Sequence, residues 1–258
     1  MKNKTTLVVR RHRWDVLPQR ARAIQEELRR HWEGEDRLPP IRTVAGLDAA
    51  FVLVESQAFA KRRRSRWHLL RDANMAIGCV VMYRFPQMEE IGRAYATLPL
   101  KFPYIPGFLS FREIPVLLAA LGKLREMPDL LFCDGQGIAH PRRMGLAAHL
   151  GVVLDRATIG CAKSLLIGTH GDLAQPAGSW APLVDEKAGG ERIGAALRTR
   201  TGVKPVYISQ GNRVSLETSI RLMLAVTDGY RIPRPTRDAD RFAGETKRKL
   251  LARAPCEK

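Results

Sequence analysis

The stretch CDGQGIAHPRR, residues 133–143, follows directly on an apolar run at 130–132. Such a run predicts a short buried strand over 129–134, with Asp134 at its end. Two glycines come next, and then His140 and a pair of arginines. An ionised carboxylate at the end of a buried strand is costly unless a cation offsets its charge. The stretch is therefore more typical of a functional site than of a purely structural turn.

The rest of the chain predicts a mixed α/β fold. Apolar and alternating runs predict strands, and apolar residues at helical spacing predict helices. Three strands close together in the sequence favour an antiparallel meander, after which strands and helices alternate. The expected strands cover 41–54, 75–85, 88–98, 129–134, 157–163 and 203–209, and the expected helices cover 15–33, 110–124, 142–150 and 215–225.

Two further segments are predicted to be irregular. Residues 171–192 are rich in Gly, Ala and Pro and are expected to form a surface excursion. The chain from 231 onward is basic and contains prolines, which favours a mobile tail that attracts phosphate groups. We therefore expect a single domain over 1–237, with an N-terminal amphipathic helix, and a basic tail over 238–258.

Composition favours a nucleic-acid partner. The 258 residues include 43 Lys and Arg against 26 Asp and Glu, which gives a formal charge of +17 and a pI near 10.4. The resulting field attracts polyanions, although solvated basic faces are also common. No apolar window is long enough to span a bilayer, so we expect a cytoplasmic protein without a membrane partner. Four cysteines without C-x-x-C spacing indicate reduced thiols that serve as small apolar groups: Cys79, Cys133, Cys161 and Cys256.

Carboxylates stand where their ionisation is costly. Asp48 lies in the apolar stretch AGLDAAF, and Asp134 ends another strand. If these strands are neighbours in one sheet, the two carboxylates face each other, and a helix packed across the sheet can bring Glu113 beside them. A divalent cation with oxygen ligands is the natural way to neutralise such a cluster. The alternatives are structural, because such an Asp can form a turn or cap, His140 can be a turn residue and Lys163 can be a surface lysine.

Four longer blocks resemble one known family, the endonuclease V family of inosine-directed nucleases. The blocks are VAGLDAAF (44–51), FPYIPGFLSFREIP (102–115), DGQGIAHPRRMGLAAHLG (134–151) and TIGCAKSLLIG (158–168), with a weaker likeness at VYISQGNRVSLETSIRL (206–222). Together they span most of the chain between 40 and 237. The resemblance implies an α/β, RNase H-like mixed sheet, in which an antiparallel meander is followed by parallel strands, flanked by helices.

The resemblance also implies a metal-dependent nuclease. By this likeness Asp48 and Asp134 bind Mg²⁺, with Mn²⁺ as an alternative ion, and Glu113 completes the acidic cluster. The ion would activate water for attack on the scissile phosphate and stabilise the developing charge. Lys163 and His140 match catalytic positions near that phosphate. The implied phosphate contacts are Lys163 and two arginines that would clamp the backbone, Arg142 and Arg143.

The second block resembles the family's wedge, a rigid loop tip that enters the nucleic acid beside the lesion. Tyr104 would be inserted, and the tip around it consists of Pro103, Ile105 and Pro106, whose prolines limit the entropy lost on ordering. Unstacking is least costly at a weakly paired base such as hypoxanthine. Without the likeness, YIPG is an ordinary turn. The likeness further implies a pocket for the extruded base, formed by Gly107, Leu109, Gly135, Gly160 and Leu166.

The chain departs from the family pattern at Asn212. Members usually carry a Gly-His-Arg triplet before the last helix, whereas this chain has Gly211, Asn212 and Arg213. An amide oxygen can still bind Mg²⁺, but it lacks the basicity of imidazole. Asn212 is therefore expected either to bind the metal or to serve as a turn residue ahead of a helix.

The sequence is compatible with three functions. The first, implied by the resemblance, is a Mg²⁺-dependent endonuclease of DNA repair that recognises inosine and hydrolyses the second phosphodiester on its 3′ side. The second is an inosine-binding protein whose catalysis is weakened by Asn212. The third is another RNase H-like nuclease, such as a junction resolvase, although a wedge has no obvious use there. The expected partner is inosine-containing DNA, with RNA as an alternative, and the expected state is a monomer.

Overall fold

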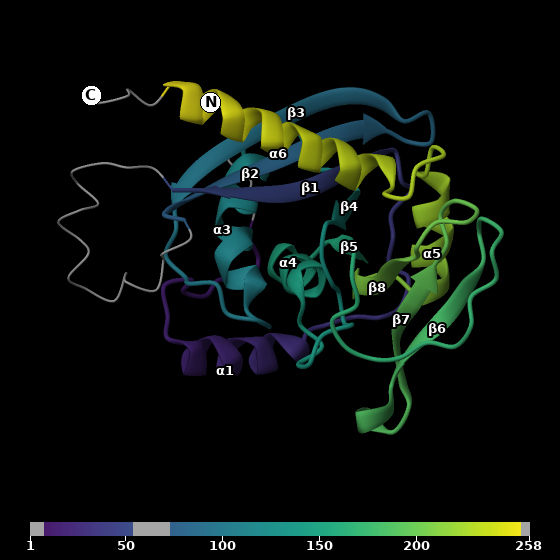
Figure 1. Cartoon of the computed structure of the whole chain (residues 1–258). Coiled ribbons are helices and arrows are strands. Elements are labelled where there is room, and N and C mark those ends of the chain that lie inside the picture. The colour runs from purple at the N-terminus through teal and green to yellow at the C-terminus, as the bar shows by residue number, and fades with distance from the viewer. Residues whose placement is uncertain (1–7, 54–72, 254–258) are drawn as a thin grey trace.

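The computed structural model describes residues 8–53 and 73–253, and one eight-stranded mixed sheet forms its centre (Figure 1). The strands are β1 (Thr43–Val52), β2 (Met75–Arg84), β3 (Glu89–Pro99), β4 (Leu130–Cys133), β5 (Ala157–Ala162), β6 (Trp180–Asp185), β7 (Glu191–Leu197) and β8 (Val206–Asn212). Their order in the sheet is β3-β2-β1-β4-β5-β8-β7-β6. The first three strands form an antiparallel meander, and β4 and β5 run parallel to β1. The predicted fold class is confirmed.

Helices cover both faces of the sheet (Figure 1). They are α1 (Pro18–Arg29), α3 (Leu109–Leu121), α4 (Leu146–Leu154), α5 (Leu216–Ala225) and α6 (Arg234–Arg253), with a short 3-10 turn, η3 (Glu186–Ala188). Because side chains alternate along a strand, Leu131 of β4 packs towards α3 and α4, whereas Leu130 and Phe132 pack towards α5 and α6. The amphipathic helix α1 packs outside α4. The core thus consists of two apolar layers, one on each side of the sheet.

The chain beyond residue 237 is helical, so the prediction of a mobile tail is wrong there. α6 packs along β1 and β2. Its inward stripe contains small buried residues at helical spacing, Ala239 and Ala243. The helix approaches the sheet so closely that a Cβ on Gly46 would lie 1.9 Å from the carbonyl oxygen of Pro235. Because many residues on its exposed side are basic, the composition of this segment does not indicate an amphipathic helix. Residues 254–258 of the expected tail lie outside the described residues.

The segment 171–192 also differs from the prediction. It contributes β6 and the start of β7, which form an antiparallel hairpin at the edge of the sheet. In β6 the buried residues Ala181 and Leu183 alternate with exposed ones, as in a strand with one covered face. Pro182 is tolerated because an edge strand leaves backbone N–H groups unpaired. Glycine and proline content therefore misled the sequence prediction at this hairpin.

Three of the four cysteines are buried and unpaired, in agreement with their predicted use as small apolar groups: Cys79, Cys133 and Cys161. Cys256 lies outside the described part of the chain. Among the described residues, no helix combines the length and the apolar character that crossing a membrane requires.

Candidate active site

Asp48 and Asp134 lie next to each other on two parallel strands. β1 pairs with β4 so that Leu47 is opposite Cys133, and the amide of Asp134 donates a hydrogen bond of 3.3 Å to the carbonyl of Leu47. The next residue of each strand is therefore an aspartate. Side chains alternate between the two faces of a sheet, and by this alternation both aspartates lie on the face that packs towards α6. The structure thus brings the first two predicted carboxylates together beneath that helix.

α3 brings Glu113 into the same electrostatic cluster. Its side chain is buried, with 7% of the residue exposed. Burial raises the pKa of Glu113 well above its usual value, and the charges of Asp48 and Asp134 raise it further. Burial, followed by the charges of Asp134 and Asp240, raises the pKa of Asp48 to about 7. Such shifts mark carboxylates that would be stabilised in their ionised form by a nearby cation.

Asp240 is a fourth acidic residue at this site, and it was not predicted from the sequence. Its carboxylate lies 3.1 Å from the ammonium of Lys163, which is also 2.6 Å from the carboxylate of Asp134. Partial burial lowers the pKa of Lys163, but the hydrogen bonds to these two carboxylates outweigh burial and raise it. The prediction of a tail over 238–258 excluded Asp240 from the domain. The signal that identifies a packed helix here is the spacing of Ala239 and Ala243.

The four carboxylates form one acidic cluster, whose donor atoms fit a hard divalent cation: Asp48, Glu113, Asp134 and Asp240. Its four carboxylates offer only oxygen atoms, which Mg²⁺ and Mn²⁺ favour. As the side chains stand, no three Asp, Glu, His or Cys side chains within residues 8–53 and 73–253 are close enough to enclose an ion. Lys163 instead places its positive charge beside Asp134. The oxygen donors of the cluster therefore suit a divalent metal ion. In the structure, the ammonium of Lys163 neutralises part of their negative charge.

A cavity of about 130 Å³ lies between the loop before α3 and the loop after β4. Tyr104 lines it and is 63% exposed, as a residue that meets a partner should be. Of the other expected wedge and pocket residues, those that line the cavity are Ile105, Pro106, Gly107, Leu109 and Leu166. Pro103 precedes Tyr104 in the same loop. Five further lining residues were not predicted from the sequence: Ser110, Gln136, Met144, Gly145 and Leu146.

The expected pocket residues Gly135 and Gly160 are not among those that line the cavity. They allow close packing beside it instead. A Cβ on Gly160 would lie 2.5 Å from the amide nitrogen of Gly137, and a Cβ on Gly135 would lie 3.1 Å from the side chain of Leu146. Because neither glycine has a side chain, the loop after β4 can pack closely against its neighbours at both positions.

The loop that carries Tyr104 is held at Gly107, which adopts a left-handed conformation with φ of 81°. Its carbonyl accepts hydrogen bonds from Arg142 Nη2 at 2.5 Å and from Gln25 at 3.2 Å, and it lies 3.0 Å from His140 Nε2. His140 Nδ1 in turn accepts from the Arg142 amide, so Nε2 carries the ring proton. Burial, followed by the charge of Arg142, lowers the pKa of His140 to about 4. His140 is therefore a neutral group that positions the loop.

The two arginines expected at the phosphate have protein partners. Arg142 Nε donates to the side-chain oxygen of Gln25 over 2.6 Å. The guanidinium of Arg143 lies 2.7 Å from the carboxylates of both Asp185 and Glu191. That both arginines bind phosphate stays a prediction. To do so, each guanidinium would have to bind the phosphate in addition to its protein partners or in place of them.

Asn212 lies apart from the acidic cluster, so the structure gives no support to its expected role as a metal ligand. It pairs with Thr158 at the start of β5, whereas Asp134 follows the end of the parallel neighbour β4. Its side-chain oxygen accepts from the amide of Glu33 at 3.0 Å, and its nitrogen donates to the carbonyl of Arg156 at 3.3 Å. With 1% of the residue exposed, both ends of the amide are used by backbone. Asn212 is a structural residue that joins β8 to two loops.

The family model of Endonuclease V matches residues 24–241, a segment that contains all four carboxylates of the cluster. The chain belongs to the Endonuclease V family. It is 48% identical over 233 residues to Endonuclease V of a Nostoc species, which corresponds to 90% of this chain and 96% of that relative. The crystal structure of Endonuclease V from Streptomyces avermitilis matches with a TM-score of 0.80 and 38% identity, over 92% of this chain and 96% of that chain.

A structure of Ciona intestinalis Endonuclease V in complex with a 24mer DNA containing an inosine followed by a ribo-adenosine also matches. Its TM-score is 0.71 at 26% identity, and the match covers 90% of this chain and 98% of that chain. Membership in the Endonuclease V family makes this chain an endonuclease that acts on DNA, and the family is one of metal-dependent nucleases. The acidic cluster is the part of the molecule that fits this chemistry.

Proposed function

We propose that this Endonuclease V is a Mg²⁺-dependent enzyme that recognises inosine in DNA and hydrolyses the second phosphodiester on the 3′ side of the lesion. The observation that carries the proposal is that α3 and the loop after β4 each contribute residues both to the cavity and to the acidic cluster. Gln136 of the cavity lies two residues after Asp134, and Ser110 of the cavity lies on α3 together with Glu113. A base held in the cavity therefore has its neighbouring phosphates close to the carboxylates. The inosine-containing DNA bound by the Ciona relative supports the same substrate.

Each part of the site has a role in this proposal. Asp48, Glu113, Asp134 and Asp240 would hold the ion, and the ion, when bound, would supply activation of water and stabilisation of charge on the phosphate. Lys163 would move its ammonium from Asp134 towards the phosphate and offset the negative charge there. Tyr104 would stack in the space that the extruded base leaves, at a cost that is least for weakly paired hypoxanthine.

The biological setting belongs to the proposal as well. An endonuclease directed to deaminated adenine serves DNA repair, and the expected location is the cytoplasm, with the enzyme acting as a monomer. The strong positive charge of the chain, +17 overall, supports binding to the phosphate backbone. RNA that contains inosine is the second substrate to be compared, because both nucleic acids present the same base and similar phosphates.

One gel tests the proposal against its alternatives. A labelled duplex with a single inosine and a matched duplex with adenosine are incubated with the enzyme, with and without Mg²⁺. We expect a nick only with inosine and Mg²⁺, at the second phosphodiester on the 3′ side. A mobility shift without a nick would identify an inosine-binding protein. Cleavage of a four-way junction without regard to inosine would identify a different nuclease.

A further inference from the structure

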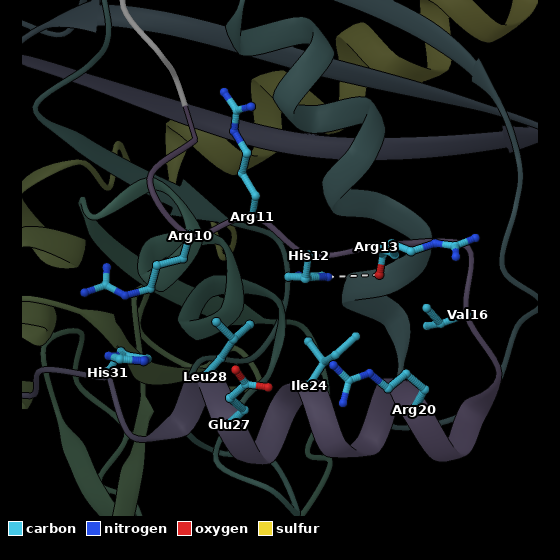
Figure 2. Close-up of a pocket in the computed structure, with 10 residues that line it drawn as sticks. All are labelled: Arg10, Arg11, His12, Arg13, Val16, Arg20, Ile24, Glu27, Leu28 and His31. Atoms are coloured by element: carbon cyan, nitrogen blue, oxygen red, sulfur yellow. Dashed lines mark hydrogen bonds between the residues drawn. The ribbon is translucent and has the colours of Figure 1, made fainter.

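A second, larger cavity of about 600 Å³ lies between residues 10–16 and α1 (Figure 2). We infer that it is a second phosphate-binding site, which takes the backbone of the nucleic acid whose lesion lies in the cavity beside Tyr104. The inference rests on the proposed function, because it requires DNA to occupy that first cavity. The arginines that line the second cavity from the N-terminal segment precede residues 24–241, the part that the family model matches.

The charge of this cavity favours an anionic ligand. Four arginines and one glutamate line it, so positive charges outnumber negative ones in the lining. Arg10 is already paired with Asp155 at 3.2 Å. Among the described residues, the guanidinium groups of Arg11, Arg13 and Arg20 have neither an ion pair nor a hydrogen bond. Planar guanidinium groups without partners match the geometry of phosphate oxygens.

Arg13, from residues 10–16, and Arg20, from α1, line the cavity from two different elements. Figure 2 shows Arg20 and Glu27 projecting from α1 towards the N-terminal segment, on the same side of the helix as Ile24, whereas Arg11 projects away from α1. Burial lowers the pKa of His12, and the charges of Glu27 and Arg20 act on the same ring in opposite directions. Arg20 and Glu27 therefore lie close to His12, and a phosphate placed there would meet cations from both elements.

The segment of residues 9–16, which precedes α1, is held in place by hydrogen bonds to the rest of the domain. The amides of Val9 and Arg10 donate to the carbonyl of Val153 at 3.0 and 3.1 Å. The ring of His12 lies 2.8 Å from His149 Nε2 and packs against Trp14 at a centroid distance of 4.0 Å. Because this backbone is already ordered, binding a phosphate does not require the backbone to be ordered as well.

Its position makes DNA the favoured source of the phosphate. Ile24 lines this cavity, and the next residue, Gln25, donates to the carbonyls of Gly107 and Met144, which line the cavity beside Tyr104. One helix, α1, thus contacts the lining of both cavities, and its diameter with side chains is about 10–12 Å. Phosphates of a single strand follow one another at a rise of about 3.4 Å, so a duplex that enters the first cavity offers several phosphates at this range. A free phosphate compound would gain nothing from this arrangement.

The test compares two double variants that each remove two exposed arginines. Arg13→Ala/Arg20→Ala alters the cavity, and Arg42→Ala/Arg125→Ala is the control, in the segments that precede β1 and β4. Binding is measured at several salt concentrations, for a long duplex with one central inosine and for duplexes shortened stepwise from either side. For the cavity variant we expect the salt slope on the long duplex to fall by about two, because two phosphate contacts are lost. This deficit should vanish when one particular flank is removed.

Three results would overturn the inference. The cavity variant could lose no more affinity than the control, its deficit could persist on the shortest duplex, or inorganic pyrophosphate could bind at the arginines while DNA affinity stays unchanged. Melting temperatures of both variants show whether either loss reflects unfolding. The preference of the wild type for inosine over adenosine duplex is measured alongside. If that preference is absent, the proposed function fails; if it is present while the two variants behave alike, only the second site fails.

Discussion

Gly46→Ala tests whether α6 belongs to the active site. Gly46 lies on β1, two residues before Asp48, and its Cβ would lie 1.9, 2.1 and 2.8 Å from the oxygen, carbonyl carbon and Cα of Pro235. All three atoms are backbone, so no side-chain rotation can relieve the contact. Ordinary contact begins at 3.4 Å, so the start of α6 must retreat by about 1.5 Å. Asp240 would move with the helix.

The expected loss follows from this displacement. Overpacking of a close contact costs about 1–3 kcal/mol, and a rigid backbone places this case at about 3 kcal/mol. For a chain of this size the melting temperature should fall by roughly 6–12 °C. A misplacement of about 1 Å can cost roughly 100-fold in rate, so nicking of the inosine duplex should fall by that factor. Both quantities are measured on one preparation, by circular dichroism and by single-turnover cleavage.

Gly244→Ala is the matched control on the same helix. A Cβ there has nothing within 4 Å, and alanine in a helix is about 0.5–1 kcal/mol more favourable than glycine. This variant should melt slightly higher and nick at the wild-type rate. If Gly46→Ala behaved in the same way, α6 would not dock on β1 as described, and the place of Asp240 in the site would be lost.

Three other variants probe single residues. Tyr104→Ala should reduce the affinity preference for an inosine duplex by about 1–3 kcal/mol and affect single-stranded substrate less; an unchanged preference would rule out the wedge. Asn212→Ala should lower the free energy of unfolding by about 1–3 kcal/mol, because two backbone groups lose their partner, and leave the Mg²⁺ requirement unchanged; a shifted requirement would restore Asn212 as a ligand. The pKa of His140 is about 4 in the folded state and about 6.5 when unfolded, so its neutral form stabilises the fold fully above pH 6.5 and less as pH falls. The difference in stability between wild type and His140→Gln should therefore decrease by about 3 kcal/mol from pH 6.5 to 4 in denaturation curves, and a constant difference would refute this.

The part of the site that depends on strand order could be predicted from the sequence. Asp48 and Asp134 each follow apolar strand residues, and parallel pairing of β1 with β4 places them together. The packing of α3 across the sheet then accounts for Glu113. These relations are local or involve one strand pair, so period-two patterning is sufficient to find them.

The remainder depends on contacts that composition conceals. Asp240 belongs to a helix whose inward stripe is alanine, and the many surrounding arginines suggest a solvated tail. Asn212 has the position of a family motif in the sequence, but the register of β8 against Thr158 carries it to the other end of β5. Register and helix docking are tertiary properties, which a single sequence specifies only through many weak preferences acting together.

The most direct test of the catalytic centre is the single-turnover rate at which Asp134→Asn nicks a duplex with one inosine in Mg²⁺. Asparagine keeps the shape of the side chain and removes the negative charge that faces Lys163 at 2.6 Å. We predict that affinity for the duplex stays within a few fold of wild type, because basic residues and Tyr104 supply most of the binding, while nicking becomes undetectable. Nicking near the wild-type rate, with the duplex bound normally, would contradict the assignment of the acidic cluster as the catalytic centre.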